Sequence, residues 1–333
     1  MIALPWLYLT LLSIGYVVAL IYGQLGVLAA VSIALLLVAG YAVRQQRNPW
    51  ARYLGHGLFI VLALGLAMHW LPGFYNGRGI APQRFTPDSV PFSMYLNQDK
   101  PLIGFWLLLA CPWIVARRSL RLSICVTAMA LTLAAIAALG GAALLGMISW
   151  APKWPDEAWL WVLNNLLLVT LVEEALFRGY IQGGLSQRFK HLPYGENLAL
   201  LLASLLFGLV HFAAGWQWML LAGIAGVGYG LAYRFGGLGA AIATHFGLNL
   251  LHFGLFTYPM LAGYAYLPVG TSGRGEGACS RWAAKRPQKT CGRYAPEREQ
   301  APSPQSAQRS QDCCKNKLNK CPAWPIPPES LAD

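Results

Sequence analysis

The sequence predicts an all-α fold, a polytopic bundle of about eight to nine transmembrane helices followed by a disordered C-terminal tail. Of its 333 residues, 56% are hydrophobic and only 11% are charged, a composition outside the range of soluble globular domains. Apolar runs of about 20 residues, the length that crosses a bilayer, recur along most of the chain. We therefore expect a multi-pass membrane protein, with the lipid bilayer as one of its partners.

The N-terminal part, residues 1–150, is expected to contribute about five of these helices. Residues 72–101 are polar and rich in Pro, Gly and Asn, which predicts an extramembrane loop. His56 and His69 lie near the two ends of the third run, where we expect packed or interfacial side chains. The total falls to eight if two of these helices form a re-entrant hairpin. The apolar runs lie at 3–23, 25–43, 53–71, 102–116 and 123–149.

Residues 151–260 are expected to form a second domain, a catalytic helix bundle. Its first helix contains the stretch LVEEALFRGYIQ at 171–182. Glycines recur in the third of its four runs, and such small residues let helices pack closely. The other three runs lie at 198–214, 217–235 and 236–256.

Basic residues indicate the orientation in the membrane. The formal net charge is +12, and arginine and lysine cluster at 44–52, 117–121 and 188–190. These clusters fall on one side if the N-terminus is cytoplasmic, as the positive-inside rule requires. Because they flank apolar runs, they argue against a nucleic-acid partner. The Arg-flanked runs and compact loops suit a bacterial inner membrane.

The last segment, residues 267–333, differs from the rest. Arg, Lys, Ser, Gln and Pro dominate it and apolar periodicity is absent, which predicts a disordered basic tail. Its five cysteines contain no C-x-x-C pair, so a zinc module is not expected there.

Three charged residues, Glu173, Glu174 and Arg178, interrupt the apolar stretch at 171–182. A charge at the centre of a transmembrane helix costs about 2.5 to 3.5 kcal/mol, so we expect these side chains to face a protein interior or a wet cavity. Neighbouring residues on a helix point about 100° apart, so the two glutamates must have different roles. Glu174 is predicted to pair with Arg178 four residues later. Glu173 is left unpaired and suited to exchange protons near neutral pH. The alternative is one buried network of all three with a structural role.

Two later helices also carry polar side chains. His211 follows Phe207 in FGLVHFA, and His245 and Asn249 lie four residues apart in HFGLNLLHF, so the latter two share one face of a helix. Polar groups at this depth need partners. We expect His211, His245 and Asn249 to share a cavity with Glu173, and we place His252 outside it as a structural residue.

Two chemistries fit this set. In the first, Glu173 and His211 deprotonate a water that attacks an amide carbonyl, while His245 and Asn249 stabilise the oxyanion, at roughly 3 to 4 kcal/mol per donor. No cofactor is required. In the second, Glu173, His211 and His245 bind zinc. The H-E-x-x-H signature of many metalloproteases is missing, but ligands on separate helices could still form such a site.

In this order, the three motifs EExxxR (173–178), FxxxH (207–211) and HxxxN (245–249) resemble those of the CPBP intramembrane proteases. That group contains CAAX prenyl endopeptidases and bacteriocin-processing and self-immunity proteins. The resemblance spans residues 159–256, and it implies hydrolysis of a peptide bond near the membrane surface. It also implies water activation by Glu173 and His211, oxyanion stabilisation by His245 and Asn249, and structural support from Glu174 and Arg178.

A membrane-tethered protein or peptide is therefore the expected substrate. Two other functions remain open on the same residues. One is a non-catalytic membrane immunity or partner protein on the same scaffold. The other is a transporter or proton relay, since intramembrane Glu and His chains also mark such pathways, although the two halves show no obvious repetition of the kind many transporters have.

Overall fold

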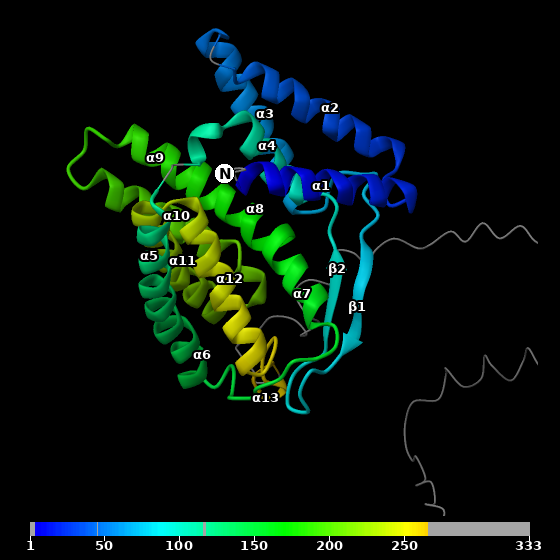
Figure 1. Cartoon of the computed structure of the whole chain (residues 1–333), viewed down its shortest axis with the longest axis vertical. Helices are drawn as coiled ribbons and strands as arrows, with labels where there is room; N and C mark the ends of the chain where they lie inside the picture. Colours follow the sequence, from blue (N-terminus) through cyan, green and yellow to red (C-terminus); the bar gives the residue numbers. More distant parts are fainter. Residues whose placement is uncertain (1–3, 45, 116–117, 266–333) are drawn as a thin grey trace, which may run out of the picture. The chain divides into compact units, whose positions relative to one another are not determined.

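The structure is a computed structural model that describes residues 4–44, 46–115 and 118–265. All of these residues belong to one compact unit. The predicted disordered tail at 267–333 falls outside the described residues. The described chain is mainly helical, which confirms the prediction of a helix bundle (Figure 1).

Each of the first four helices corresponds to one of the apolar runs. Asn48 caps the third of them by accepting a hydrogen bond from the Ala51 amide at 2.7 Å, and Pro49 fits the first helical position because its missing N–H is not needed there. The helices are α1 (Leu4–Ile21), α2 (Val27–Ala42), α3 (Pro49–Ala67) and α4 (Pro101–Ala110), and a short 3₁₀ turn, η1 (Pro112–Ile114), follows.

Two long helices come next, and each contains π-helical turns, in which one extra residue is inserted per turn. The first, Leu120–Leu144, consists of α5 (Leu120–Ala134), η2 (Ala135–Leu139) and α6 (Gly140–Leu144). The second, Ala158–Arg188, carries Glu173, Glu174 and Arg178, and we call it the motif helix. It consists of α7 (Ala158–Asn164), η3 (Asn165–Thr170), α8 (Leu171–Glu174), η4 (Ala175–Gln182) and α9 (Gly183–Arg188).

The remaining helices complete the bundle around the motif helix. They are α10 (Gly195–Leu209), η5 (Phe212–Ala214), α11 (Trp216–Gly236), α12 (Leu238–Leu255) and α13 (Ala262–Ala265). Gly237 separates α11 from α12 with a φ of +82°, a backbone conformation that favours glycine. This single residue reverses the chain, so that α12 returns beside α11.

One feature departs from the all-α prediction. The loop at 72–101 contains an antiparallel hairpin of β1 (Gly77–Gln83) and β2 (Phe92–Leu96), paired from Gly77↔Leu96 to Gln83↔Phe92. Its buried Ile80 and Met94 pack with Trp161 of α7 and Phe253 of α12. The hairpin therefore runs along the start of the motif helix (Figure 1).

An apolar core joins the N-terminal helices to the motif helix, with α4 between them. Leu102 and Leu107 of α4 are buried in one cluster with Val172 and Ala175. The phenol of Tyr180 on η4 also lies 2.9 Å from Nδ1 of His56 on α3. His56 is thus a packed residue, and His69 is likewise paired with the buried Asp99. The N-terminal helices brace the motif helix along one side.

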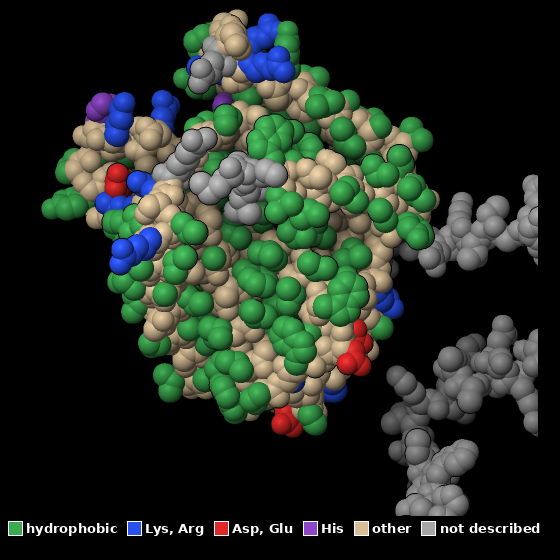
Figure 2. Space-filling view, viewed as in Figure 1, with side chains coloured by type: hydrophobic (Ala, Val, Ile, Leu, Met, Phe, Trp, Pro, Cys, Tyr) green, Lys and Arg blue, Asp and Glu red, His purple; other side chains and the backbone are tan. Residues whose placement is uncertain are grey.

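Four helices of the described chain are long and apolar enough to cross a membrane: Pro49–Ala67, Leu120–Leu144, Ala158–Arg188 and Leu238–Leu255. Several other apolar helices are shorter, so the count of eight to nine spans is not confirmed and stays a prediction. Large apolar side chains cover the visible face of the bundle (Figure 2). Leu144, for example, is 92% exposed. Such a surface is expected where lipid replaces water as the surrounding medium, and it indicates a membrane protein.

Candidate active site

The centre of the candidate site is a buried ion pair on the motif helix. Nε of Arg178 donates to Oε2 of Glu174 at 3.2 Å, and both side chains are fully buried. Nη1 of Arg178 reaches Oγ of Ser204 on α10 at 3.5 Å. The guanidinium also lies over the ring of Phe207, 5.2 Å from its centroid. This pair therefore ties the motif helix to α10.

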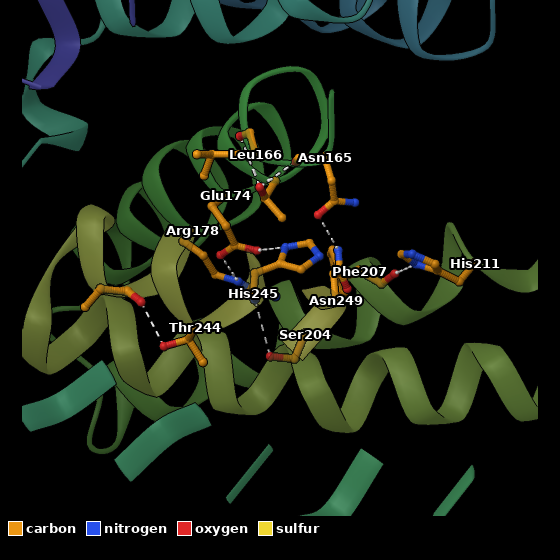
Figure 3. A network of polar contacts seen from close by, with 12 residues as sticks. Asn165, Leu166, Glu174, Arg178, Ser204, Phe207, His211, Thr244, His245 and Asn249 are labelled. Carbon is orange, nitrogen blue, oxygen red and sulfur yellow. Dashed lines mark hydrogen bonds and ion pairs between the residues drawn. The ribbon is translucent and has the colours of Figure 1, made fainter. Parts of the chain in front are cut away.

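The second oxygen of the Glu174 carboxylate accepts a hydrogen bond from another helix. Nδ1 of His245, on α12, lies 2.9 Å from Oε1 of Glu174 (Figure 3). The sequence predicts Glu174 as a partner of Arg178 alone, so this contact was not foreseen. Glu174 thus serves two motifs, because it neutralises Arg178 and orients the imidazole of His245.

Two aromatic rings hold the imidazole of His245 from other sides. Tyr229 of α11 stacks on it, with ring centroids 4.4 Å apart and planes 13° apart. Phe207 meets it edge to face, at 5.6 Å and 89°. Tyr229 is buried, and sequence reasoning missed it because an aromatic residue in an apolar helix ordinarily indicates packing alone. With Glu174 at Nδ1, these rings fix the orientation of His245.

His211 lies just beyond the C-terminal end of α10, in the turn before η5, rather than within a helix. Its Nδ1 lies 2.7 Å from the carbonyl oxygen of Phe207 and can only donate to it. The neutral ring then carries its lone pair at Nε2, the form that accepts a proton or binds a metal. The ring of His211 is 4.8 Å from that of Phe207. Phe207 therefore touches both histidines of the predicted set.

Asn249 faces the motif helix one turn after His245, as the four-residue spacing predicts. Its Nδ2 donates to Oδ1 of Asn165 at 3.2 Å (Figure 3). Asn165 is the second residue that sequence reasoning missed. The sequence signal that could have found it is the one that pointed to Asn249, namely an amide side chain inside an apolar helix.

The structure gives Glu173 a different environment from its neighbour. Its side chain is half-buried, and it makes no hydrogen bond or ion pair with any residue that the structure describes. Glu173 thus takes no part in the ion pair that its neighbour Glu174 forms with Arg178. Within the same described ranges, no three His, Cys, Asp or Glu side chains are grouped closely enough to hold a metal ion, so Glu173, His211 and His245 do not form a ligand set in this geometry.

Three parts of the chain thus contribute a carboxylate–arginine pair, two histidines and an amide, and both histidines contact Phe207. Residues 155–251 match the family model of the type II CAAX prenyl endopeptidase Rce1-like proteins. The chain contains an Rce1-like domain. This Rce1-like domain includes every motif residue from Glu173 to Asn249 and is consistent with the CPBP group. It covers less than a third of the chain and leaves α1 to α6 outside the match. No curated protein and no solved structure matches the chain.

Proposed function

We propose that the protein is an intramembrane endopeptidase that hydrolyses a peptide bond in a membrane-tethered protein or peptide. The observation that carries this proposal is the placement of His211 and His245 against one ring, Phe207, with His245 bonded to the residue next to Glu173. Three sequence-distant motifs thereby supply both proton acceptors and hydrogen-bond donors. The Rce1-like match supports a peptidase and a membrane-associated substrate.

The proposed reaction starts with a water molecule beside Glu173 and His211. The carboxylate of Glu173, assisted by Nε2 of His211, takes a proton from the water as its oxygen attacks the scissile carbonyl carbon. The C=O electron pair moves to oxygen and forms a tetrahedral oxyanion, which His245 and Asn249 stabilise by hydrogen bonds. The C–N bond then breaks, and the same proton passes to the leaving nitrogen. The products are a carboxylic acid and an amine.

The donor role of His245 requires a particular protonation form. A neutral ring that donates its Nδ1–H to Glu174 has only a lone pair at Nε2, whereas the doubly protonated ring also offers an Nε2–H. Oxyanion stabilisation needs the second form, and the Glu174 carboxylate at 2.9 Å supplies its counter-charge. With Arg178 and an ionised Glu173, the four charges then sum to zero. This balance favours the arrangement in surroundings of low dielectric constant.

Zinc hydrolysis through Glu173, His211 and His245 stays a separate prediction. These residues would have to move together, because they do not form a metal-binding group in the described geometry. A strong chelator separates the two chemistries: the proposed reaction is unaffected by it, whereas a metal site loses activity and regains it with zinc.

The deciding experiment is a cleavage assay in liposomes with a library of membrane-tethered peptides. We expect wild type to cleave at least one peptide, and Glu173→Gln and His245→Ala to cleave none while folding normally. Glu157→Gln, at the start of the same helix and half-buried, is the matched control and should retain activity. A Glu173→Gln protein that still performs its role in cells would overturn the enzymatic proposal in favour of a non-catalytic partner protein. We also propose a bacterial inner membrane as the location, which fractionation of the expressing cells tests.

A further inference from the structure

Asn165 lies outside all three motifs and contacts the one motif residue that has an amide. Its side chain is buried, with 8% of the residue exposed, and its Oδ1 accepts the hydrogen bond from Nδ2 of Asn249 at 3.2 Å. Neither amide makes another side-chain hydrogen bond to any described residue. The two side chains therefore depend on each other for their orientation.

The fold directs Asn165 toward α12 by means of a π-helical turn. Nine residues separate Asn165 from Glu174, and nine α-helical steps of about 100° would place them on opposite faces. In the structure both residues contact α12, through Asn249 and His245 respectively. The π turn η3 lies between them and takes up one extra residue. Eight effective steps leave the two side chains only about 80° apart, which brings both onto the site.

A buried hydroxyl group stabilises this π turn. Oγ1 of Thr170 donates to the backbone carbonyl of Asn165 at 2.7 Å and lies 3.1 Å from that of Leu166. Thr170 is fully buried. A π turn disturbs the regular pairing of backbone groups, and the Thr170 hydroxyl supplies a partner for the carbonyl of Asn165. The π turn and the Thr170 hydroxyl therefore fix the position of Asn165 on the helix.

In the structure this contact engages the N–H₂ edge of the Asn249 amide, which faces Oδ1 of Asn165. A primary amide has an N–H₂ edge and a C=O edge, and rotation about its last side-chain bond exchanges them with little hindrance. Only the N–H₂ edge can stabilise an oxyanion. An acceptor at Asn165 binds one N–H and leaves the other N–H of the same nitrogen for the reaction.

We propose that Asn165 is the positioning residue of the oxyanion site, holding the amide of Asn249 with its N–H toward the substrate. This inference rests on the proposed endopeptidase function. It predicts that an acceptor oxygen at position 165, rather than an amide as such, is what the reaction needs. The same role extends to any peptide-bond substrate, because every such substrate forms the same oxyanion.

The test compares variants at position 165 in the liposome cleavage assay. We expect Asn165→Leu to lower kcat about tenfold or more with little change in KM, since loss of one oxyanion donor costs about 10²- to 10³-fold in kcat. Asn165→Asp keeps an acceptor oxygen and should retain most of the wild-type kcat. Asn249→Ala combined with Asn165→Leu should be no slower than Asn249→Ala alone, because both changes remove the same interaction.

Asn164→Leu is the matched control, since Asn164 is the neighbouring amide and its side chain makes no hydrogen bond to the residues that the structure describes; it should leave kcat unchanged. Equal losses in Asn165→Asp and Asn165→Leu, or fully additive effects in the double variant, would overturn the positioning role. If Asn165→Leu does not fold, the Asp variant and the smaller Asn165→Ala variant decide by the same criteria. If wild type cleaves and every Asn165 variant cleaves equally fast, this inference alone is refuted. If Glu173→Gln still cleaves, the proposed function is refuted.

Discussion

Nδ1 of His245 lies 2.9 Å from Oε1 of Glu174, although 71 residues separate them in the sequence. The same carboxylate holds Arg178 at 3.2 Å through its other oxygen. A single buried glutamate therefore supports the fold through Arg178 and the candidate chemistry through His245. These two roles can be separated experimentally.

Replacing both members of the buried ion pair should destabilise the protein less than replacing Glu174 alone, but it should not restore cleavage. Glu174→Leu alone leaves Arg178 as an unpaired buried cation and should destabilise the protein by about 3–5 kcal/mol. Glu174→Leu combined with Arg178→Met removes both charges and should recover most of that loss. The double variant should still fail to cleave, because His245 has lost its Nδ1 partner. Circular dichroism during unfolding in detergent measures the stability, and the liposome assay measures the cleavage. Recovery of cleavage in the double variant would show that Glu174 does not act through His245.

Tyr229 should be replaceable by phenylalanine but not by leucine. The stacked ring at 4.4 Å from His245 is retained in Tyr229→Phe, so we expect activity within about twofold of wild type. Tyr229→Leu removes the stack and leaves part of a buried volume empty, which should cost roughly 1–3 kcal/mol and reduce kcat more than KM. Steady-state kinetics and thermal unfolding of both variants check this. An inactive Tyr229→Phe would instead indicate that the hydroxyl takes part in the reaction.

Gly208 should tolerate no side chain, because α10 and α11 approach each other there. A Cβ at this position would lie 2.7 Å from the Met219 carbonyl oxygen and 3.1 Å from Cα of Gly223, and a backbone atom can give way only if the helix moves. Gly208→Ala should therefore destabilise the protein by about 1–3 kcal/mol and lower activity by displacing Phe207. In Gly239→Ala, the control on α12, the added Cβ meets nothing within 4 Å, and the change should be neutral or stabilising by up to about 1 kcal/mol. Equal unfolding temperatures for the two variants would contradict the close approach.

The pKa of Lys153 should lie well below that of an ordinary lysine. Burial lowers its pKa from 10.5 to about 8, and its ammonium nitrogen donates to the carbonyl oxygen of Phe256, just after α12. Between pH 8 and 10.5 the unfolded chain binds more protons than the folded one at this residue, so its contribution to stability should rise with pH across that window. Acylation with limiting reagent, followed by mass spectrometry, should show half-maximal reactivity of Lys153 near pH 8, with the exposed Lys190 as an internal reference. Lys153→Met should lose this part of the pH dependence, and half-maximal reactivity near pH 10.5 would contradict the prediction.

Much of the helical framework could be predicted, because apolar runs long enough to span a bilayer are a local property of the sequence. In the part of the chain that the structure describes, the longer helices lie close to the predicted runs. The hairpin at 77–96 could not be predicted, since β1 contains Pro82 and lacks a regular alternation of apolar residues, and β2 has only five residues. Its strands are held by packing on Trp161 and Phe253 rather than by their own pattern. Tertiary contacts therefore determine this element.

In the candidate site, too, some relationships follow from the sequence and others from tertiary contacts. The sequence alone determined that Glu174 and Arg178 share a helix face, as do His245 and Asn249, because both pairs are four residues apart, about one α-helical turn. Only the tertiary structure decided that His245 meets Glu174 and that Asn249 meets Asn165. The physical reason is the helix phase: a π turn shifts every later side chain by about one residue's rotation, and the crossing of α12 over the motif helix selects which side chains touch.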